Sequence, residues 1–209
     1  LPTETEEDMR AIPELADQIA RRYYEIPKDQ RNGKCQITTS TSFFIPKPFT
    51  PFQWARMYTN EEYISRAAIV KHAFNEQLNR KSLKYHWHDA EVTVLEGVFA
   101  RGDRKTSEVI KEAYHLGCLY DSWSDRFDND KWMQAFENTG IDIAFYNLRE
   151  RPLDEVFPWD FIDIGVTKEF LKQEWNHAMN AEVTPNCRMK CSGCGVAKWK
   201  GGVCIESKN

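Results

Sequence analysis

The first hundred residues alternate between helical and extended patterns of apolar positions. Apolar side chains recur every three or four positions in two segments, residues 5–24 and 60–78, as they do in helices with one buried face. Two other segments are typical of strands, residues 36–45 and 82–88, while residues 92–99 fit either a helix or a strand. This order predicts an α/β fold with a parallel sheet or a barrel, of which residues 1–100 would supply about half.

The first residues of the chain match the pattern that caps the N-terminus of a helix. Thr5 and Asp8 match the capping-box pattern, in which a hydroxyl and a carboxylate bind the free backbone amides of a starting helix. A helix at this position in an α/β protein normally follows a strand, and the chain opens at Leu1 without a Met. We therefore expect the chain to be a piece of a longer protein whose preceding part supplies further strands.

The second half of the chain is expected to be mostly helical. Its three predicted helices cover residues 107–116, 129–138 and 167–179, and the aromatic segment at 157–163 is interpreted as packing. Four of the six cysteines follow residue 186. The expected organisation is the C-terminal half of a barrel (1–100), a helical extension (101–180) and a small Cys-rich metal or cluster segment (181–209).

Composition and charge narrow the class of protein. Hydrophobic residues make up 41% of the 209 residues, and the net charge is -4. This charge argues against a general electrostatic attraction to nucleic acid or anionic lipid. No apolar run approaches the roughly 20 residues that cross a bilayer, and no secretory signal is visible. We expect a cytoplasmic protein that does not bind membranes.

The cysteines at the end of the chain have the spacing of metal ligands. Cys187, Cys191 and Cys194 form a C-x3-C-x2-C pattern, and Cys204 follows ten residues later. A segment with so few apolar residues has no core of its own, and four thiolates would suit Zn²⁺ or an iron–sulfur cluster. Disulfides are the alternative, which the lack of a secretory signal disfavours. The sequence leaves zinc and iron–sulfur open, and leaves the ligand role of Cys204 open as well.

Four segments carry a resemblance to a known family. They are Leu-Pro-Thr-Glu-Thr at residues 1–5, Phe-Ile-Pro-Lys-Pro-Phe-Thr-Pro-Phe-Gln-Trp at 44–54, Leu-Glu-Gly-Val-Phe-Ala-Arg-Gly-Asp-Arg at 95–104 and Trp-Asp-Phe-Ile-Asp-Ile-Gly-Val at 159–166. Together they resemble the C-terminal part of B12-binding-domain radical S-adenosylmethionine (radical SAM) proteins, a subgroup without an assigned substrate that also ends in a cysteine cluster. The subgroup spaces its last two cysteines closely, whereas here Cys204 is distant from Cys194.

The resemblance implies cofactors and partners. The whole protein would bind a [4Fe–4S] cluster and S-adenosylmethionine, and an upstream domain would carry cobalamin. It would perform a radical methylation or a related modification of an unknown substrate, with RNA as one candidate. Its partner would be the missing N-terminal part of the same protein. Since the catalytic C-x3-C-x2-C motif would lie upstream, the chain alone is expected to be inactive.

Candidate ligand-binding residues follow from their places near the expected strand end. Alternation puts Ser40 and Ser42 on one strand face, where their hydroxyls would meet the ribose or methionine part of S-adenosylmethionine, or else bond to each other or to the backbone. Lys47 and Gln53 lie in the proline-rich loop beyond the strand and would meet substrate or cobalamin, or else serve only the architecture of that loop.

Two further groups of polar residues are candidates for a metal site and for an ion-pair network. His86 and His88 would share a strand face, but no third metal ligand lies at motif spacing. A buried ion-pair network that fixes a turn is expected from Glu96, Arg101 and Asp103, with a contact to a cofactor as the alternative.

A different class of function competes with the enzyme. The chain would then be a helical binding module whose metal knuckle docks a protein or RNA partner. Phosphate contacts would come from basic residues near the cysteines, and a stacking contact from Trp199 among them; the basic residues are Arg188, Lys190, Lys198 and Lys200. Lysines that only keep an exposed loop soluble would leave the same pattern.

Overall fold

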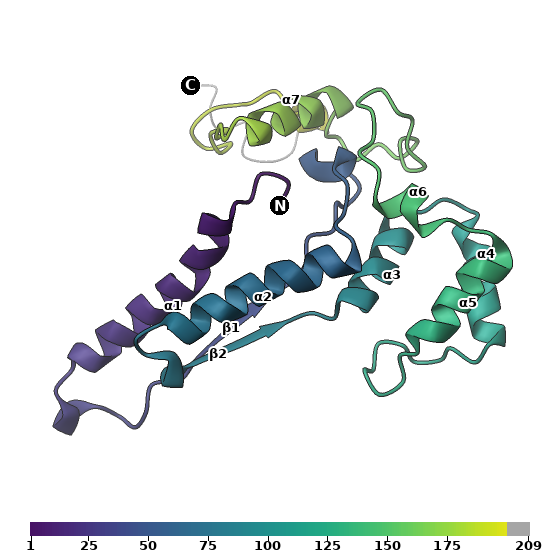
Figure 1. Cartoon of the computed structure of the whole chain (residues 1–209). Helices are drawn as coiled ribbons and strands as arrows, with labels where there is room; N and C mark the ends of the chain where they lie inside the picture. The colour runs from purple at the N-terminus through teal and green to yellow at the C-terminus, as the bar shows by residue number, and fades with distance from the viewer. Residues whose placement is uncertain (200–209) are drawn as a thin grey trace. The chain divides into compact units, whose positions relative to one another are not determined.

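The computed structural model describes residues 1–199, so Cys204 lies outside the described residues. Within them the chain forms seven α-helices, several short 3-10 turns and two parallel strands, which confirms an α/β fold that is mostly helical (Figure 1). The described residues divide into two compact units. The first contains Thr3–Phe44 and Tyr58–Leu95, and the second contains Ile45–Met57 and residues 96–199.

The first unit follows the predicted order of elements. Its helices and strands are α1 (Glu6–Glu25), β1 (Ile37–Thr41), α2 (Asn60–Glu76), β2 (Leu83–Trp87) and the start of α3 (Ala90–Arg101). The capping box at Thr5 and Asp8 is present, with mutual hydrogen bonds of 3.2 and 2.8 Å. The ambiguous segment at 92–99 is a helix.

The two strands pair in parallel, with Ile37 beside Leu83 and Thr41 beside Trp87. β1 is shorter than the predicted segment because it ends five residues before Pro46, where the chain enters the proline-rich loop. Proline lacks the backbone N–H that a strand ladder needs, and it also restricts the residue before it. The parallel connection through α2 is the crossover that such a pair requires.

One face of this sheet forms the core of the first unit. Met9 and Ala16 of α1 pack with Val70 and Phe74 of α2, and the side chains of Ile37, Leu83 and Tyr85 lie against them. Helical spacing predicts a buried face made of apolar residues of this segment: Ile64, Ala67, Ala68, Val70, Ala73, Phe74 and Leu78. The prediction is right for Ala67, Val70, Ala73 and Phe74. It is wrong for Ala68, which is exposed, and for Ile64 and Leu78, which are 54% and 78% exposed. Ile64 is turned away from the strands, and Leu78 lies beyond the end of the helix.

The second unit has an aromatic core. It contains α4 (Thr106–His115), α5 (Asn129–Thr139), α6 (Ile143–Asn147), α7 (Lys168–Met179) and the 3-10 turns η2 (Pro51–Trp54) and η4 (Val196–Trp199). The three predicted helices are confirmed, and Gly140 ends α5 with a φ of 65° in the left-handed region that favours glycine. Among residues 157–163, Phe157 and Trp159 are buried as predicted, whereas Phe161 is 86% exposed and does not pack.

None of the helices in the described part of the chain has the length and apolar character of a membrane span.

Candidate functional site

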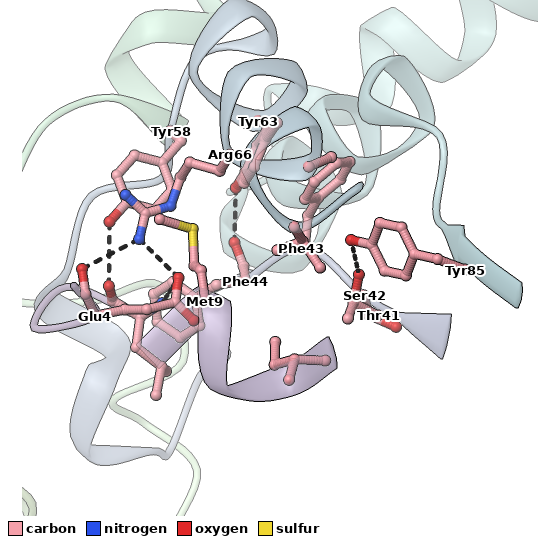
Figure 2. A pocket seen from close by; sticks show the side chains of 14 residues that line it. Glu4, Met9, Thr41, Ser42, Phe43, Phe44, Tyr58, Tyr63, Arg66 and Tyr85 are labelled. Carbon is pink, nitrogen blue, oxygen red and sulfur yellow. Dashed lines mark hydrogen bonds and ion pairs between the residues drawn. The ribbon is translucent and has the colours of Figure 1, made fainter. Parts of the chain in front are cut away.

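A cavity of about 270 Å³ opens at the carboxyl end of β1. It is bounded by the segment before α1 and the first turns of that helix, by the end of β1 and the residues that follow it, by α2 with the residue Tyr58 before it, and by one side chain of β2 (Figure 2). Most of the lining is apolar or aromatic: Leu1, Met9, Ile12, Phe43, Phe44, Tyr58, Tyr63, Ala67, Val70 and Tyr85. Its position corresponds to the end of a parallel sheet at which ligands commonly bind.

Arg66 and Glu4 supply the charges of the cavity wall. The Arg66 guanidinium donates to Glu4 Oε2 at 2.6 Å and to the Glu4 backbone carbonyl at 3.2 Å. The same guanidinium lies over the ring of Tyr58, 4.6 Å from its centroid. Both charged side chains are about one-quarter exposed, so water screens their attraction only in part. The two side-chain charges of this pair offset each other.

Two tyrosines close the cavity with hydrogen bonds to β1 and to the residues after it. The Tyr63 hydroxyl donates to the Phe44 carbonyl at 2.6 Å, and the hydroxyls of Thr41 and Tyr85 lie 2.8 Å apart (Figure 2). Burial raises the pKa of Tyr85, so it stays a neutral phenol at neutral pH. The arrangement suits the binding of an apolar or aromatic part of a ligand rather than proton transfer.

The two predicted serines lie on the other face of the sheet or beyond it. Ser40 is exposed and sits beside His86 in the parallel register. Ser42 is also exposed, follows the last residue of β1 and contributes to the cavity lining. Their contact with S-adenosylmethionine stays a prediction.

Lys47 and Gln53 belong to the second unit, and each has a partner there. Lys47 forms an ion pair with Glu96, and both side chains are about half exposed. Gln53 is only 2% exposed, and its side-chain oxygen accepts hydrogen bonds from the Phe49 backbone at 3.2 Å and from Trp159 Nε1 at 3.0 Å. The contacts of Gln53 match the architectural alternative, because they fix the proline-rich loop against the aromatic core.

Three cysteines of the Cys-rich segment lie within the described residues. Cys187 and Cys191 are exposed and Cys194 is half-buried, and none forms a disulfide with another residue among 1–199. In the same range, no three His, Cys, Asp or Glu side chains are gathered as a metal site. The fourth expected ligand, Cys204, lies outside the described residues, so the four-cysteine site stays a prediction. Cys35 and Cys118 have no neighbouring cysteine at ligand spacing, so both are expected to be buried as small apolar residues; Cys118 is buried, whereas Cys35 is only half-buried.

The segment around Cys194 is anchored to the turn that precedes α7. The Cys194 carbonyl accepts a hydrogen bond from the Thr167 backbone at 2.9 Å, and Lys198 pairs with Asp163 at 2.8 Å. Gly195 has a φ of 104°, and a side chain there would come within 2.7 Å of the Gly165 carbonyl. Hence residues 194–198 are held against the end of the Trp-Asp-x-Ile-Asp-x-Gly-Val segment and the start of α7.

The remaining candidates are the histidine pair and the charged cluster at the end of α3. His86 and His88 are exposed and belong to no metal-binding group within residues 1–199. Glu96 pairs with Lys47 at the surface, so the expected buried network is wrong for Glu96. Asp103 instead accepts a hydrogen bond from the Tyr146 hydroxyl at 3.1 Å, a partner that lies 43 residues away.

Sequence reasoning missed the cavity residues Glu4, Tyr58 and Arg66. A signal was present, since Tyr63, Arg66 and Val70 recur at helical spacing and place an arginine beside the buried face of α2. An arginine at such a position needs a partner, but the partner is 62 residues distant and has no local pattern.

Comparisons of the chain with models of protein families, with curated proteins and with solved structures found no match.

Proposed function

We propose that the chain is the C-terminal part of a radical SAM barrel, belonging to an enzyme that uses S-adenosylmethionine, with cobalamin in an upstream domain, for a radical methylation or a related modification. The observation that carries the proposal is the one-sided cover of the sheet. Both α1 and α2 pack on the same face of β1 and β2, while the other face is exposed and polar. A barrel has this arrangement, with helices outside and the second strand face turned inward.

The cavity supports the same proposal by its place. It lies at the carboxyl end of β1, the end of the strands where barrel enzymes bind their ligands. Its aromatic lining would shield part of a bound ligand from water, and Arg66, held by Glu4 and Tyr58, would keep the opening rigid. Ser42, at the rim, would donate a hydrogen bond to a ligand hydroxyl or carboxylate.

The residues of the chain fit only part of the implied cofactor set. Ligands for the catalytic cluster would come from the upstream part, because residues 1–199 contain no gathered group of metal ligands. The cysteine tail offers soft thiolate donors at Cys187, Cys191, Cys194 and Cys204, which suit structural zinc or an accessory iron–sulfur cluster in kind. When bound, the catalytic cluster and S-adenosylmethionine would supply the radical chemistry.

The deciding experiment uses the whole protein encoded by the gene. Purified without oxygen and given a reductant, it is expected to convert S-adenosylmethionine into 5′-deoxyadenosine and methionine, whereas the 209-residue chain is expected to be inactive. The coding sequence before Leu1 should contain a C-x3-C-x2-C motif after a strand, about a hundred residues upstream by barrel size.

A start codon immediately before Leu1, or turnover by the chain alone, would contradict the proposal. The first outcome would favour the binding module instead. In that case the chain should bind a protein or RNA partner through the basic residues around its cysteines, such as Arg188 and Lys190.

A further inference from the structure

The exposed face of the β1–β2 sheet carries four polar side chains. Alternation along the strands places Thr38 and Ser40 of β1, together with Lys84 and His86 of β2, on the face opposite the core. All four are exposed. The parallel register sets Thr38 beside Lys84 and Ser40 beside His86.

The four positions are close enough for one small ligand to contact them all. Paired residues on neighbouring strands are about 4.8 Å apart, and alternate residues of one strand are about 6.6 Å apart. The four side chains therefore rise from the corners of a small rectangle. Two hydroxyls, an ammonium and an imidazole can all donate hydrogen bonds, and none of the four is a carboxylate.

This face is unusual for a parallel sheet. Parallel sheets are normally covered on both faces, and their strands are then apolar on both sides. An apolar layer could not cover this face without a large cost of desolvation, because it carries the polar side chains of Thr38, Ser40, Lys84 and His86. Lys84 and His86 form no ion pair with another side chain among residues 1–199. The face is therefore suited to contact water or a polar ligand.

We propose that Thr38, Ser40, Lys84 and His86 bind a phosphate group of the substrate. The inference rests on the proposed function, in which this face lines the barrel interior. A lysine is a common point-charge partner of phosphate, whereas a planar carboxylate is better matched by the flat fork of an arginine. Four donors at separate corners of one sheet face also fit a group whose oxygens point in several directions.

The experiment measures pyrophosphate binding to the 209-residue chain. The probe is inorganic pyrophosphate, followed by calorimetry and by the NMR signal of the His86 imidazole, which is identified by its loss in His86→Gln. Binding should shift this signal, and Lys84→Met should weaken binding by about tenfold or more, since it removes one charge-assisted contact. Lys81→Met is the matched control, because Lys81 is an exposed lysine of the 3-10 turn Arg80–Ser82 and lies outside β2. It should leave the affinity within about twofold, as expected for a distant surface charge.

Competition identifies the source of the phosphate. Displacement of pyrophosphate by a short single-stranded RNA would indicate a nucleic-acid substrate, and displacement by ribose 5-phosphate alone would indicate a small phosphorylated one. An unchanged His86 signal at saturating pyrophosphate, or equal losses in Lys84→Met and Lys81→Met, would overturn the inference.

The two proposals can fail separately. If the whole protein cleaves S-adenosylmethionine but Lys84→Met leaves pyrophosphate binding intact, only the phosphate site is refuted. If pyrophosphate binding depends on Lys84 while the whole protein never cleaves S-adenosylmethionine, the radical SAM proposal fails and the phosphate-binding face stands.

Discussion

Arg66 of α2 and Glu4, which precedes α1, are joined by a 2.6 Å hydrogen bond across the cavity wall. The contact ties the beginning of the chain to the second helix, and it closes one side of the cavity that would hold a ligand. Its loss should therefore affect both the stability of the first unit and the shape of the cavity.

The coupling between Arg66 and Glu4 is expected to be measurable. A double-mutant cycle with Arg66→Met and Glu4→Gln should give a coupling free energy of unfolding of about 1 kcal/mol, since the pair is partly shielded from water. Chemical denaturation of the four proteins measures it. Arg22 and Glu25 form a matched exposed pair, at 82% and 63% exposure. Their coupling should stay below about 0.5 kcal/mol. Equal coupling energies in the two pairs would contradict the prediction.

Asp17 makes the first unit sensitive to acid. The carboxylate is 1% exposed and accepts hydrogen bonds from the Asn79 backbone at 2.8 Å and from Arg21 at 2.6 Å. Burial opposes its charged form, but these bonds outweigh burial and hold the pKa of Asp17 below its usual value. Its stabilising effect is complete above the unfolded-state pKa of about 4 and is lost as pH falls through the lower folded-state pKa.

The variant Asp17→Asn should therefore lose about 2 kcal/mol of stability at pH 7 and show a flatter decline below about pH 4. Denaturation across an acid pH series measures both effects. Asp29→Asn, at an exposed position, is the control. An unchanged slope in Asp17→Asn would show that other carboxylates govern the acid sensitivity.

Tyr146 should govern stability in alkali. Burial, with a hydrogen bond to Asp103, raises the pKa of Tyr146 to about 12. A raised pKa stabilises the protein below the unfolded-state pKa of about 10, and this effect is lost as pH rises to about 12. Tyr146→Phe should lower the free energy of unfolding at pH 8 and reduce its fall between these two pH values. Tyr120→Phe, at a 77% exposed position, should keep the steep fall. A steep fall in both variants would refute the assignment.

Gly195 should control the docking of the cysteine tail. Gly195→Ala would place a methyl group 2.7 Å from the Gly165 carbonyl at a φ of 104°, which alanine tolerates poorly. The tail should detach, and hydrogen exchange at the Thr167 amide, which binds Cys194, should become faster. Gly193→Ala is the control, since that glycine has a φ of 73° but open space around it. Similar exchange rates in both variants would point to backbone strain rather than to the close contact.

Metal analysis tests the cysteine tail. Purified without oxygen, the chain should contain one zinc, or four irons with a visible absorption band, and Cys191→Ser should lose the metal. Cys35→Ser is the control, because Cys35 is a half-buried thiol with no neighbouring cysteine at ligand spacing. A metal-free chain, or metal that remains in Cys191→Ser, would refute the site.

Local features could be predicted from the sequence, because neighbouring residues determine them. The capping residues Thr5 and Thr167 and the helix end at Gly140 follow from hydrogen bonds and backbone geometry within one turn. The βα order was predictable from apolar spacing for the same reason.

Long-range contacts were not predictable, because no periodic pattern encodes them. The sequence predicts that Gln53 is a loop residue accessible to ligands. In the structure its side-chain oxygen accepts a hydrogen bond from Trp159, which lies 106 residues away. The sequence predicts that Glu96 joins a buried network with its neighbours. In the structure it forms an ion pair with Lys47 instead. The choice of partner in each case depends on how distant segments fold together.

The sheet of the first unit has a further consequence for handling the protein. Within residues 1–199 it consists of β1 and β2 alone, so each strand has one border with no hydrogen-bonded neighbour. Such borders are templates for adding strands from other molecules. The chain should therefore be prone to self-association through its backbone, and its aggregation should increase steeply with protein concentration.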